Sequence, residues 1–210
     1  MSDVDIDDLL SSKIRQLKAD DQLFVEAEDW QMNACLNWYH DPTELYIVGY
    51  KEAGDALVQS VANRNGTADS LIFPIVFLYR QYIELRLKSL LLEGSRLLDI
   101  AYEQKRGHQL SKLWPKVRSI LAELWPEGSK TGFVVFDCLI AQFEQVDPGS
   151  TTFRYPKDLY GNNSLKIDSP RVNLRNLKEV VGAMAVILEG AAAAISEFQG
   201  LKRGMQTERW

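Results

Sequence analysis

Thiol and imidazole groups are scarce in this sequence, which has two cysteines and two histidines among its 210 residues. Cys35 and Cys138 cannot build a disulfide framework, and the ligands for a zinc site of the usual kind are too few. Each cysteine sits in an apolar helical pattern, so we expect both thiols to be reduced and buried. We expect no metal and no other cofactor.

Signals for export and for membrane insertion are also missing. The N-terminal residues are acidic and lack the apolar core segment of a signal peptide. The most apolar stretch, 180–195, is preceded by Lys178 and Glu179 and contains Glu189. We therefore expect it to be too short and too charged to span a bilayer. These absences predict a cytoplasmic protein with no membrane partner.

Several common signatures of enzymes and metal sites are absent. The sequence contains no glycine-rich phosphate loop of the Walker type, no dinucleotide-binding fingerprint and no serine nucleophile elbow. The acidic residues near the N-terminus also lack the spacing of a calcium-binding loop. Any chemistry must therefore come from a less familiar arrangement of residues.

The charge of the chain is negative overall and unevenly placed. The net charge is -5, but residues 1–60 hold thirteen acidic and four basic residues, whereas 61–210 hold sixteen and twenty. An acidic chain argues against loose, charge-driven binding of nucleic acids, although it leaves room for a local basic pocket in the larger part. The acidic start is either a solvated helix surface or an element that covers a basic face.

What the sequence does contain is helical periodicity in an ordinary globular composition, 46% apolar and 25% charged. We predict an all-α fold, an antiparallel bundle of about six or seven helices. One domain is expected over 1–210, with acidic N-terminal helices in 1–66 and the core bundle in 69–200. Helical periodicity is found in the segments 4–18, 22–39, 42–63, 71–93, 96–104, 113–124, 131–145 and 173–198.

The segment 146–172 interrupts the helical pattern. Residues 151–155 and 165–167 alternate between apolar and polar side chains, and Gly161 with two asparagines forms a turn signal between them. We therefore predict a small two-stranded β-ribbon near 150–168. Irregular segments of this length are uncommon in compact domains and often functional, so the ribbon is a place to look for a site.

A stripe of charge marks the most apolar predicted helix. Arg80, Glu84 and Lys88 follow one another at intervals of four residues and therefore share one face. They form either a partly exposed ladder of ion pairs or a polar slot in the bundle that receives a phosphate or another anion.

A cationic corner precedes another predicted helix. Arg106 and His108 flank Gly107 just before the helix, where free backbone N–H groups favour anions. The alternative is that His108 caps the helix and packs on Trp114, since histidine is often a structural residue.

A third candidate lies in the predicted ribbon. Strand alternation places Phe153 and Tyr155 on one face and Arg154 on the other. The planar guanidinium fork suits a carboxylate or a phosphate. The alternative is a structural salt bridge from Arg154 to Asp147 or Asp168.

Together these segments resemble a known family. Residues 79–88, then His108-Gln109-Leu110 with Leu113-Trp114, then 153–156 are similar to HEPN-like proteins, named for higher eukaryotes and prokaryotes nucleotide-binding. The resemblance covers roughly 70–200. It implies an antiparallel bundle, often dimeric, and many bacterial members belong to toxin–antitoxin or phage-defence systems. Active members are metal-independent ribonucleases with an Arg-x4-6-His motif, which this sequence lacks.

The resemblance implies a HEPN-like module that binds a nucleotide, an RNA end or an antitoxin-like partner protein, in a bacterial stress or phage-defence system. We also expect a homodimer, with tryptophans at 30, 38 and 210 as interface candidates. The alternatives are a metal-independent ribonuclease with His108 as general acid and base, or a scaffold whose polar stripe is purely structural. We predict one concave anion pocket bounded by Arg80, His108 and Arg154. The further binding residues expected there are Glu84, Lys88, Arg106 and Tyr155.

Overall fold

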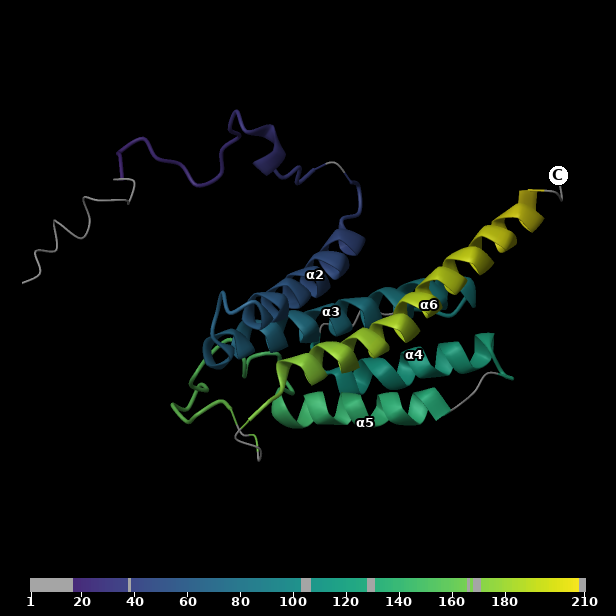
Figure 1. Cartoon of the computed structure of the whole chain (residues 1–210). Helices are drawn as coiled ribbons and strands as arrows, with labels where there is room; N and C mark the ends of the chain where they lie inside the picture. The colour runs from purple at the N-terminus through teal and green to yellow at the C-terminus, as the bar shows by residue number, and fades with distance from the viewer. Residues whose placement is uncertain are drawn as a thin grey trace, which may run out of the picture. The chain divides into compact units, whose positions relative to one another are not determined.

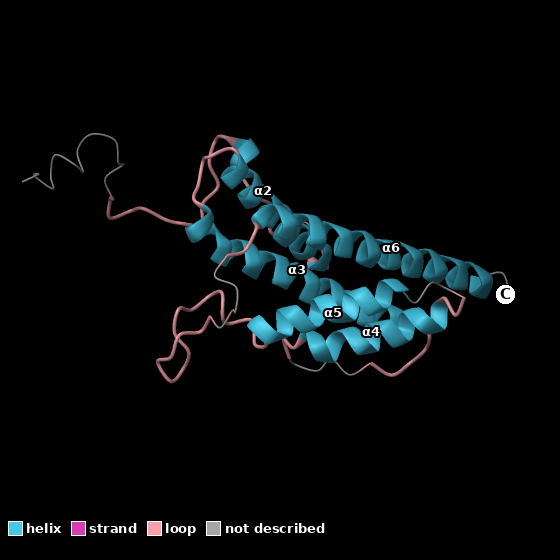
Figure 2. Cartoon of the chain, turned by 60° about the horizontal axis from the view of Figure 1, so that its bottom comes forward, coloured by secondary structure: helices cyan, strands magenta, loops and turns pink. Residues whose placement is uncertain are grey.

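The computed structural model describes residues 17–37, 39–102, 107–127, 131–165, 167 and 171–207. The chain divides into two units, Met1–His40 and Asp41–Trp210, and each is described by itself. Within the described residues the second unit consists of five α-helices and irregular segments, without a strand (Figures 1 and 2). The prediction of an all-α bundle is confirmed. The helices are α2 (Thr43–Ala62), α3 (Ala68–Leu97), α4 (Leu110–Leu124), α5 (Thr131–Val146) and α6 (Leu174–Thr207).

The helix α3 forms the centre of the bundle and contacts α2, α4 and α6. Its apolar side chains point in all directions, and Tyr79, Ile83 and Leu87 are completely buried. Close packing against α2 depends on Gly54, because a Cβ there would lie 2.7 Å from the Tyr79 ring. A helix that is apolar on every face is stable only inside a bundle, so this central position follows from its sequence.

The helices α4 and α5 form a second layer beside α3. The apolar stripe predicted on α4 is buried, with Leu110, Trp114 and Val117 in the core. Trp114 stacks on Phe136 of α5 with ring centroids 4.2 Å apart. This aromatic pair joins α4 to the N-terminal half of α5.

The predicted number of helices is too high. Residues 22–37 contain only one turn of 3-10 helix, Trp30–Met32, and none of its residues is buried. Amphipathic periodicity alone does not stabilise a helix that packs on no core. The predicted helix 96–104 is also wrong over its described part, because α3 ends at Leu97 and Asp99 takes a left-handed φ of 55°. The predicted helix 4–18 lies almost wholly outside the described residues.

The predicted β-ribbon near 150–168 is wrong for the residues that the structure describes there. A single antiparallel bridge, Lys157 to Asn163, replaces the two strands. The reason is local: the Asp147 carboxylate accepts the backbone N–H groups of Thr151 and Thr152. Asp158 accepts N–H groups in the same way further along. Such side-chain caps satisfy the backbone in turns and compete with strand pairing.

Two further predictions are wrong, one about the burial of the cysteines and one about the length of the apolar C-terminal stretch. Both cysteines are free and exposed rather than buried. The apolar stretch 180–195 belongs to α6, which has 34 residues, so it is not too short. By length and composition alone α6 could cross a membrane, and 28% of its most apolar window is buried in this structure. Core helices of soluble proteins pass the same test, and the cytoplasmic location stays a prediction.

Candidate functional site

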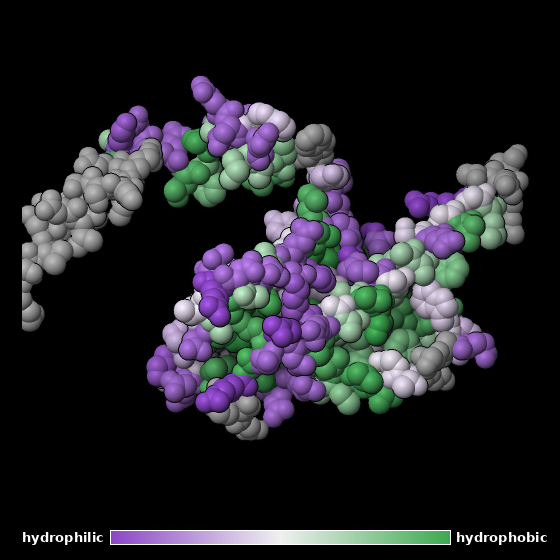
Figure 3. Space-filling view, viewed as in Figure 1, coloured by the Kyte–Doolittle hydropathy of each residue, from purple (hydrophilic) through white to green (hydrophobic). Residues whose placement is uncertain are grey.

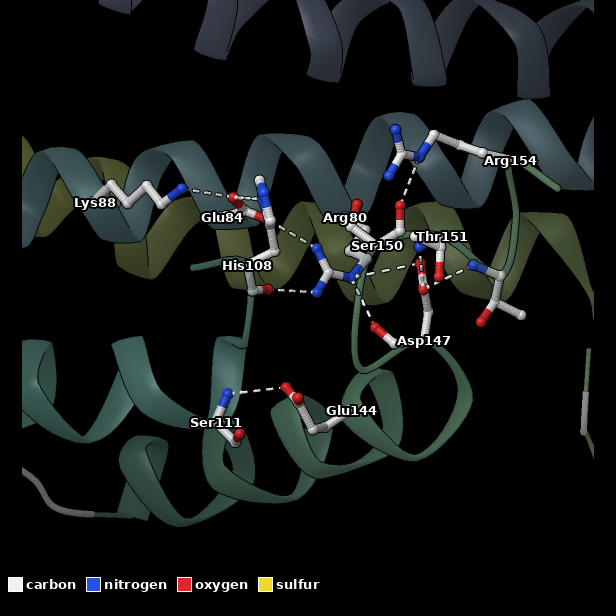
Figure 4. Close-up of polar contacts among 11 residues, drawn as sticks. Arg80, Glu84, Lys88, His108, Ser111, Glu144, Asp147, Ser150, Thr151 and Arg154 are labelled. Atoms are coloured by element: carbon white, nitrogen blue, oxygen red, sulfur yellow. Dashed lines mark hydrogen bonds and ion pairs between the residues drawn. The ribbon is translucent and has the colours of Figure 1, made fainter. Parts of the chain in front are cut away.

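Arg80 joins three segments of the bundle from a fully buried position on α3 (Figure 4). Its Nη1 donates to Glu84 Oε2 at 2.8 Å, and its Nη2 donates to the backbone carbonyl of His108 at 2.6 Å. Its Nε donates to the backbone carbonyl of Asp147 at 3.0 Å, and the Asp147 carboxylate lies 3.5 Å away. The guanidinium therefore ties α3 to the start of α4 and the end of α5.

Glu84 stands at the centre of the cluster and has only 2% of its side chain exposed. Its carboxylate accepts Arg80, accepts Lys88 Nζ at 2.7 Å and lies 2.8 Å from His108 Nδ1. Burial alone would raise the pKa of Glu84, but the hydrogen bonds from Lys88, His108 and Arg80 outweigh it and lower the pKa. The carboxylate is therefore ionised at neutral pH.

Lys88 and His108 bring this cluster to the surface. The side chain of Lys88 is 29% exposed and that of His108 is 61% exposed. Because Nδ1 of His108 faces Glu84, the ring is held with Nε2 directed away from that carboxylate. A single buried carboxylate thus fixes the Lys88 ammonium group and the His108 ring beside each other where a ligand can reach them.

Arg154 belongs to the irregular segment after α5. It lies beside α3, beyond Ser150 as seen from Lys88 and His108 (Figure 4). Its Nε donates to the Ser150 carbonyl at 2.6 Å. Ser150 has a left-handed φ of 57°. Its guanidinium carbon lies 5.6 Å from the Phe77 ring centre and 5.4 Å from the Tyr155 ring centre. Cation–π stacking of this kind orients the exposed guanidinium without neutralising its charge.

The structure brings together four of the predicted site residues, Arg80, Glu84, Lys88 and His108, and places Arg154 and Tyr155 next to one another nearby. Arg106 lies outside the described residues. Arg80 has no exposed surface, so in this structure it positions other groups and cannot line an anion pocket as we expected. The salt bridge considered from Arg154 to Asp147 is not found, because Asp147 faces Arg80 instead. The other partner considered, Asp168, lies outside the described residues.

A second ion cluster, centred on the buried Arg86 with partly exposed carboxylates around it, was missed by the sequence analysis. Arg86 on α3 donates to Glu44 of α2 and to Glu189 of α6, with N···O distances of 2.7 Å for both pairs. Tyr82 donates its hydroxyl to Glu189 at 2.8 Å, and burial together with this bond raises the tyrosine pKa. The three partners are far apart in sequence, so periodicity gave no signal for this cluster.

In comparisons with known proteins, the chain matches no family model, no curated protein and no solved structure.

Proposed function

We propose that the chain is a HEPN-like binding module that takes a phosphate group, of a nucleotide or an RNA end, against Lys88 and His108. The observation that carries this proposal is the buried carboxylate of Glu84, which holds the side chains of Lys88 and His108 in one place. Arg80, buried behind the site, donates to the backbone carbonyl of His108 and so holds the backbone of this residue in place. Arg154, with Tyr155 stacked on it, offers a second contact farther along α3.

The charge of this site suits an anion. The two buried carboxylates, Glu84 and Asp147, are balanced by Arg80 and Lys88, and the nearby Arg154 adds one positive charge that neither carboxylate faces. Because the exposed groups are cationic and the carboxylates are buried beneath them, an approaching phosphate meets donors first.

A direct test is the binding of a fluorescent oligoribonucleotide with a 5′-phosphate, followed by anisotropy and compared with the same strand bearing a 5′-hydroxyl. We expect Lys88→Gln and His108→Gln each to weaken binding by about tenfold, the effect of losing a charged hydrogen bond of about 1.5 kcal/mol. Binding should also weaken with added salt, since phosphate contacts release counterions.

The matched control is Lys202→Gln, because that lysine is also ion-paired and its side chain has a similar exposure, 35%. It lies near the C-terminal end of α6 and bonds Asp99. If Lys202→Gln weakens binding as much as Lys88→Gln does, the binding is non-specific and the proposed site is wrong.

A second candidate, a metal-independent ribonuclease, is favoured by the contact between Glu84 and His108. A buried carboxylate 2.8 Å from Nδ1 fixes the orientation of the imidazole, as general acid–base catalysis requires. Cleavage of RNA in the presence of EDTA that is lost in His108→Ala would establish this alternative. Binding without cleavage keeps the first proposal.

An antitoxin-like protein partner and a role in bacterial stress or phage defence are proposals that rest on the family resemblance. The acidic segment 17–37 supports a protein partner, because its large apolar side chains, among them Phe24, Trp30 and Leu36, are exposed. Exposed apolar side chains of this size are typical of interaction segments.

A further inference from the structure

A groove of about 590 Å³ runs between α3 and α6, on the face of α3 opposite to Glu84. We call it the α3/α6 groove. Printed bonds join the two helices at both of its ends. Arg86 of α3 pairs with Glu189 of α6 at 2.7 Å, and Gln199 of α6 donates its Nε2 to the backbone carbonyl of Glu93 at 3.0 Å. The two helices therefore lie side by side along the whole groove.

The middle of the α3/α6 groove is apolar and has low walls. Leu90 and Ile195 form its floor and are almost completely buried. Between the charged ends, the walls carry small side chains: Ser89 of α3 and Ala192, Ala193 and Ser196 of α6. Low walls let the backbone of a third helix come close, so that its apolar side chains can reach the floor.

The first end of the groove presents carboxylates to solvent and hides its cation. The side chain of Arg86 is only 3% exposed, whereas those of its two partners, Glu44 and Glu189, are 61% and 45% exposed. Two carboxylates share one guanidinium group, which leaves one negative charge in excess. Figure 3, in the view of Figure 1, shows hydrophilic surface where the N-terminal end of α2 approaches α6, next to a hydrophobic area on α6.

The second end of the groove carries another exposed carboxylate. The side chain of Glu93 is 36% exposed and pairs with Arg96, three residues farther along the same helix. Such surface pairs contribute little to stability, so Glu93 can exchange this partner for another cation at small cost. Arg86 and Glu93 are seven residues apart on α3, which corresponds to about 10.5 Å along the helix axis.

We propose that the α3/α6 groove binds an amphipathic α-helix of another protein, with a basic residue at each end of its apolar stripe. Residues seven positions apart lie on one face of a helix and are about 10.5 Å apart, which matches the separation of the two acidic ends. Apolar residues three and four positions after the first cation then face Leu90 and Ile195. The exposed carboxylates argue against a second copy of this chain as the occupant, since its own net charge is -5.

The α3/α6 groove contains no residue of the anion site around Glu84. The proposal therefore stands or fails independently of the proposed function. Variants of the groove should bind the 5′-phosphorylated oligoribonucleotide as the native chain does.

The test uses the full chain and a fluorescent synthetic helical peptide, followed by anisotropy. The peptide has lysines at positions i and i+7, leucines at i+3 and i+4, and alanine and glutamine elsewhere. We expect it to bind, and to bind more weakly as salt is added. The same peptide with both lysines replaced by glutamate should not bind. A dissociation constant weaker than about 1 mM for the lysine peptide, or equal binding of the glutamate peptide, overturns the proposal.

A substitution in the wall of the groove tests where the peptide binds. Ala193→Arg should weaken binding by at least about tenfold, because it adds both bulk and positive charge to the groove. The matched control is Ala183→Arg, the same change at an exposed alanine of α6 that does not line the groove. Arginine is a good helix former, and far-UV circular dichroism checks that the helices persist. Equal weakening by both variants would show that the peptide binds elsewhere, which overturns the proposal.

A second substitution tests the charge at the far end. Glu93→Gln should weaken binding of the lysine peptide by about fivefold, the upper range for an exposed ion pair. It leaves Arg86 with both of its partners, so the bundle keeps its buried cation paired. Glu197→Gln, on α6 outside the groove, is the control and should leave binding unchanged. If Glu93→Gln has no more effect than Glu197→Gln, the acidic ends do not select the ligand and the proposal is wrong.

A small polycation is the other occupant that this charge could attract. Spermidine is therefore titrated against the native chain and against Ala193→Arg by isothermal calorimetry. If spermidine binds, loses that binding in Ala193→Arg, and the lysine peptide does not bind, the groove is a polyamine site. That result overturns the proposal of a helical partner.

Discussion

Arg80 shows how a charged residue is accommodated inside this bundle. All three of its nitrogen atoms donate to acceptors that lie on α3, at the start of α4 and after α5. A buried ion pair adds little stability over an apolar pair of the same shape, but losing one partner is expensive because the other charge stays buried. Arg80 thus determines which segments meet around Glu84 more than how stable they are.

Replacing Arg80 by methionine should therefore destabilise the protein by about 3–5 kcal/mol, the usual cost of breaking a buried pair. Chemical denaturation measures this difference in the free energy of unfolding. Arg154→Met is the comparison, since Arg154 is exposed and its loss should cost less than about 1 kcal/mol. Similar losses for both variants would mean that the contacts of Arg80 do not hold the segments together.

The carboxylate of Glu84 makes stability depend on pH in a defined direction. Its pKa in the folded protein is lower than the ordinary value of 4.5, so its ionised form favours folding. That contribution is complete above pH 4.5 and is lost as the pH falls through the lower folded pKa. We expect the free-energy gap between the native chain and Glu84→Gln to shrink when urea unfolding is repeated below pH 4.5. A gap that stays constant would contradict the assignment.

At the scale of elements, α3 determines the arrangement of its neighbours. It contacts α2, α4 and α6, and its buried charged residues Arg80 and Arg86 make the polar bonds that orient the other helices. The apolar residues of α3 supply most of the favourable packing, whereas the two arginines select one arrangement among several that would bury the same surface.

The packing contribution of α3 is measured by Leu87→Ala. Leu87 is completely buried, so the substitution should leave a cavity and cost about 2–5 kcal/mol in the free energy of unfolding. Leu45→Ala on α2 serves as control, because Leu45 is 49% exposed and its truncation should cost less than about 1 kcal/mol. If the two losses are equal, Leu87 does not belong to the core.

For the whole molecule, the central place of α3 predicts an order of protection. Amide hydrogen exchange monitored by mass spectrometry should find the slowest exchange in residues 75–91, whose backbone opens only when the bundle unfolds. Residues 17–37 should exchange fastest, since the structure buries none of their side chains. Fast exchange in 75–91 would show that α3 is not the centre of the bundle.

The all-α class and the positions of the longer helices could be predicted from local sequence patterns. The apolar pattern of α3 and the regular stripe of α4 were sufficient, because helical periodicity is a local property of the chain. The same logic correctly placed Arg80, Glu84 and Lys88 on one face. It failed at residues 22–37, where the periodic pattern exists but no core is present to bury it.

The roles of those charged residues depend on long-range contacts that no sequence pattern predicts. Contacts of Arg80 with the carbonyls of His108 and Asp147 join residues 28 and 67 positions apart, and no local pattern encodes such a distance. The inward turn of the α5 carboxylates likewise depends on where α4 lies. The periodicity of a sequence shows which side chains share one face of a helix. The burial and the partners of those side chains depend on what the rest of the chain places against that face.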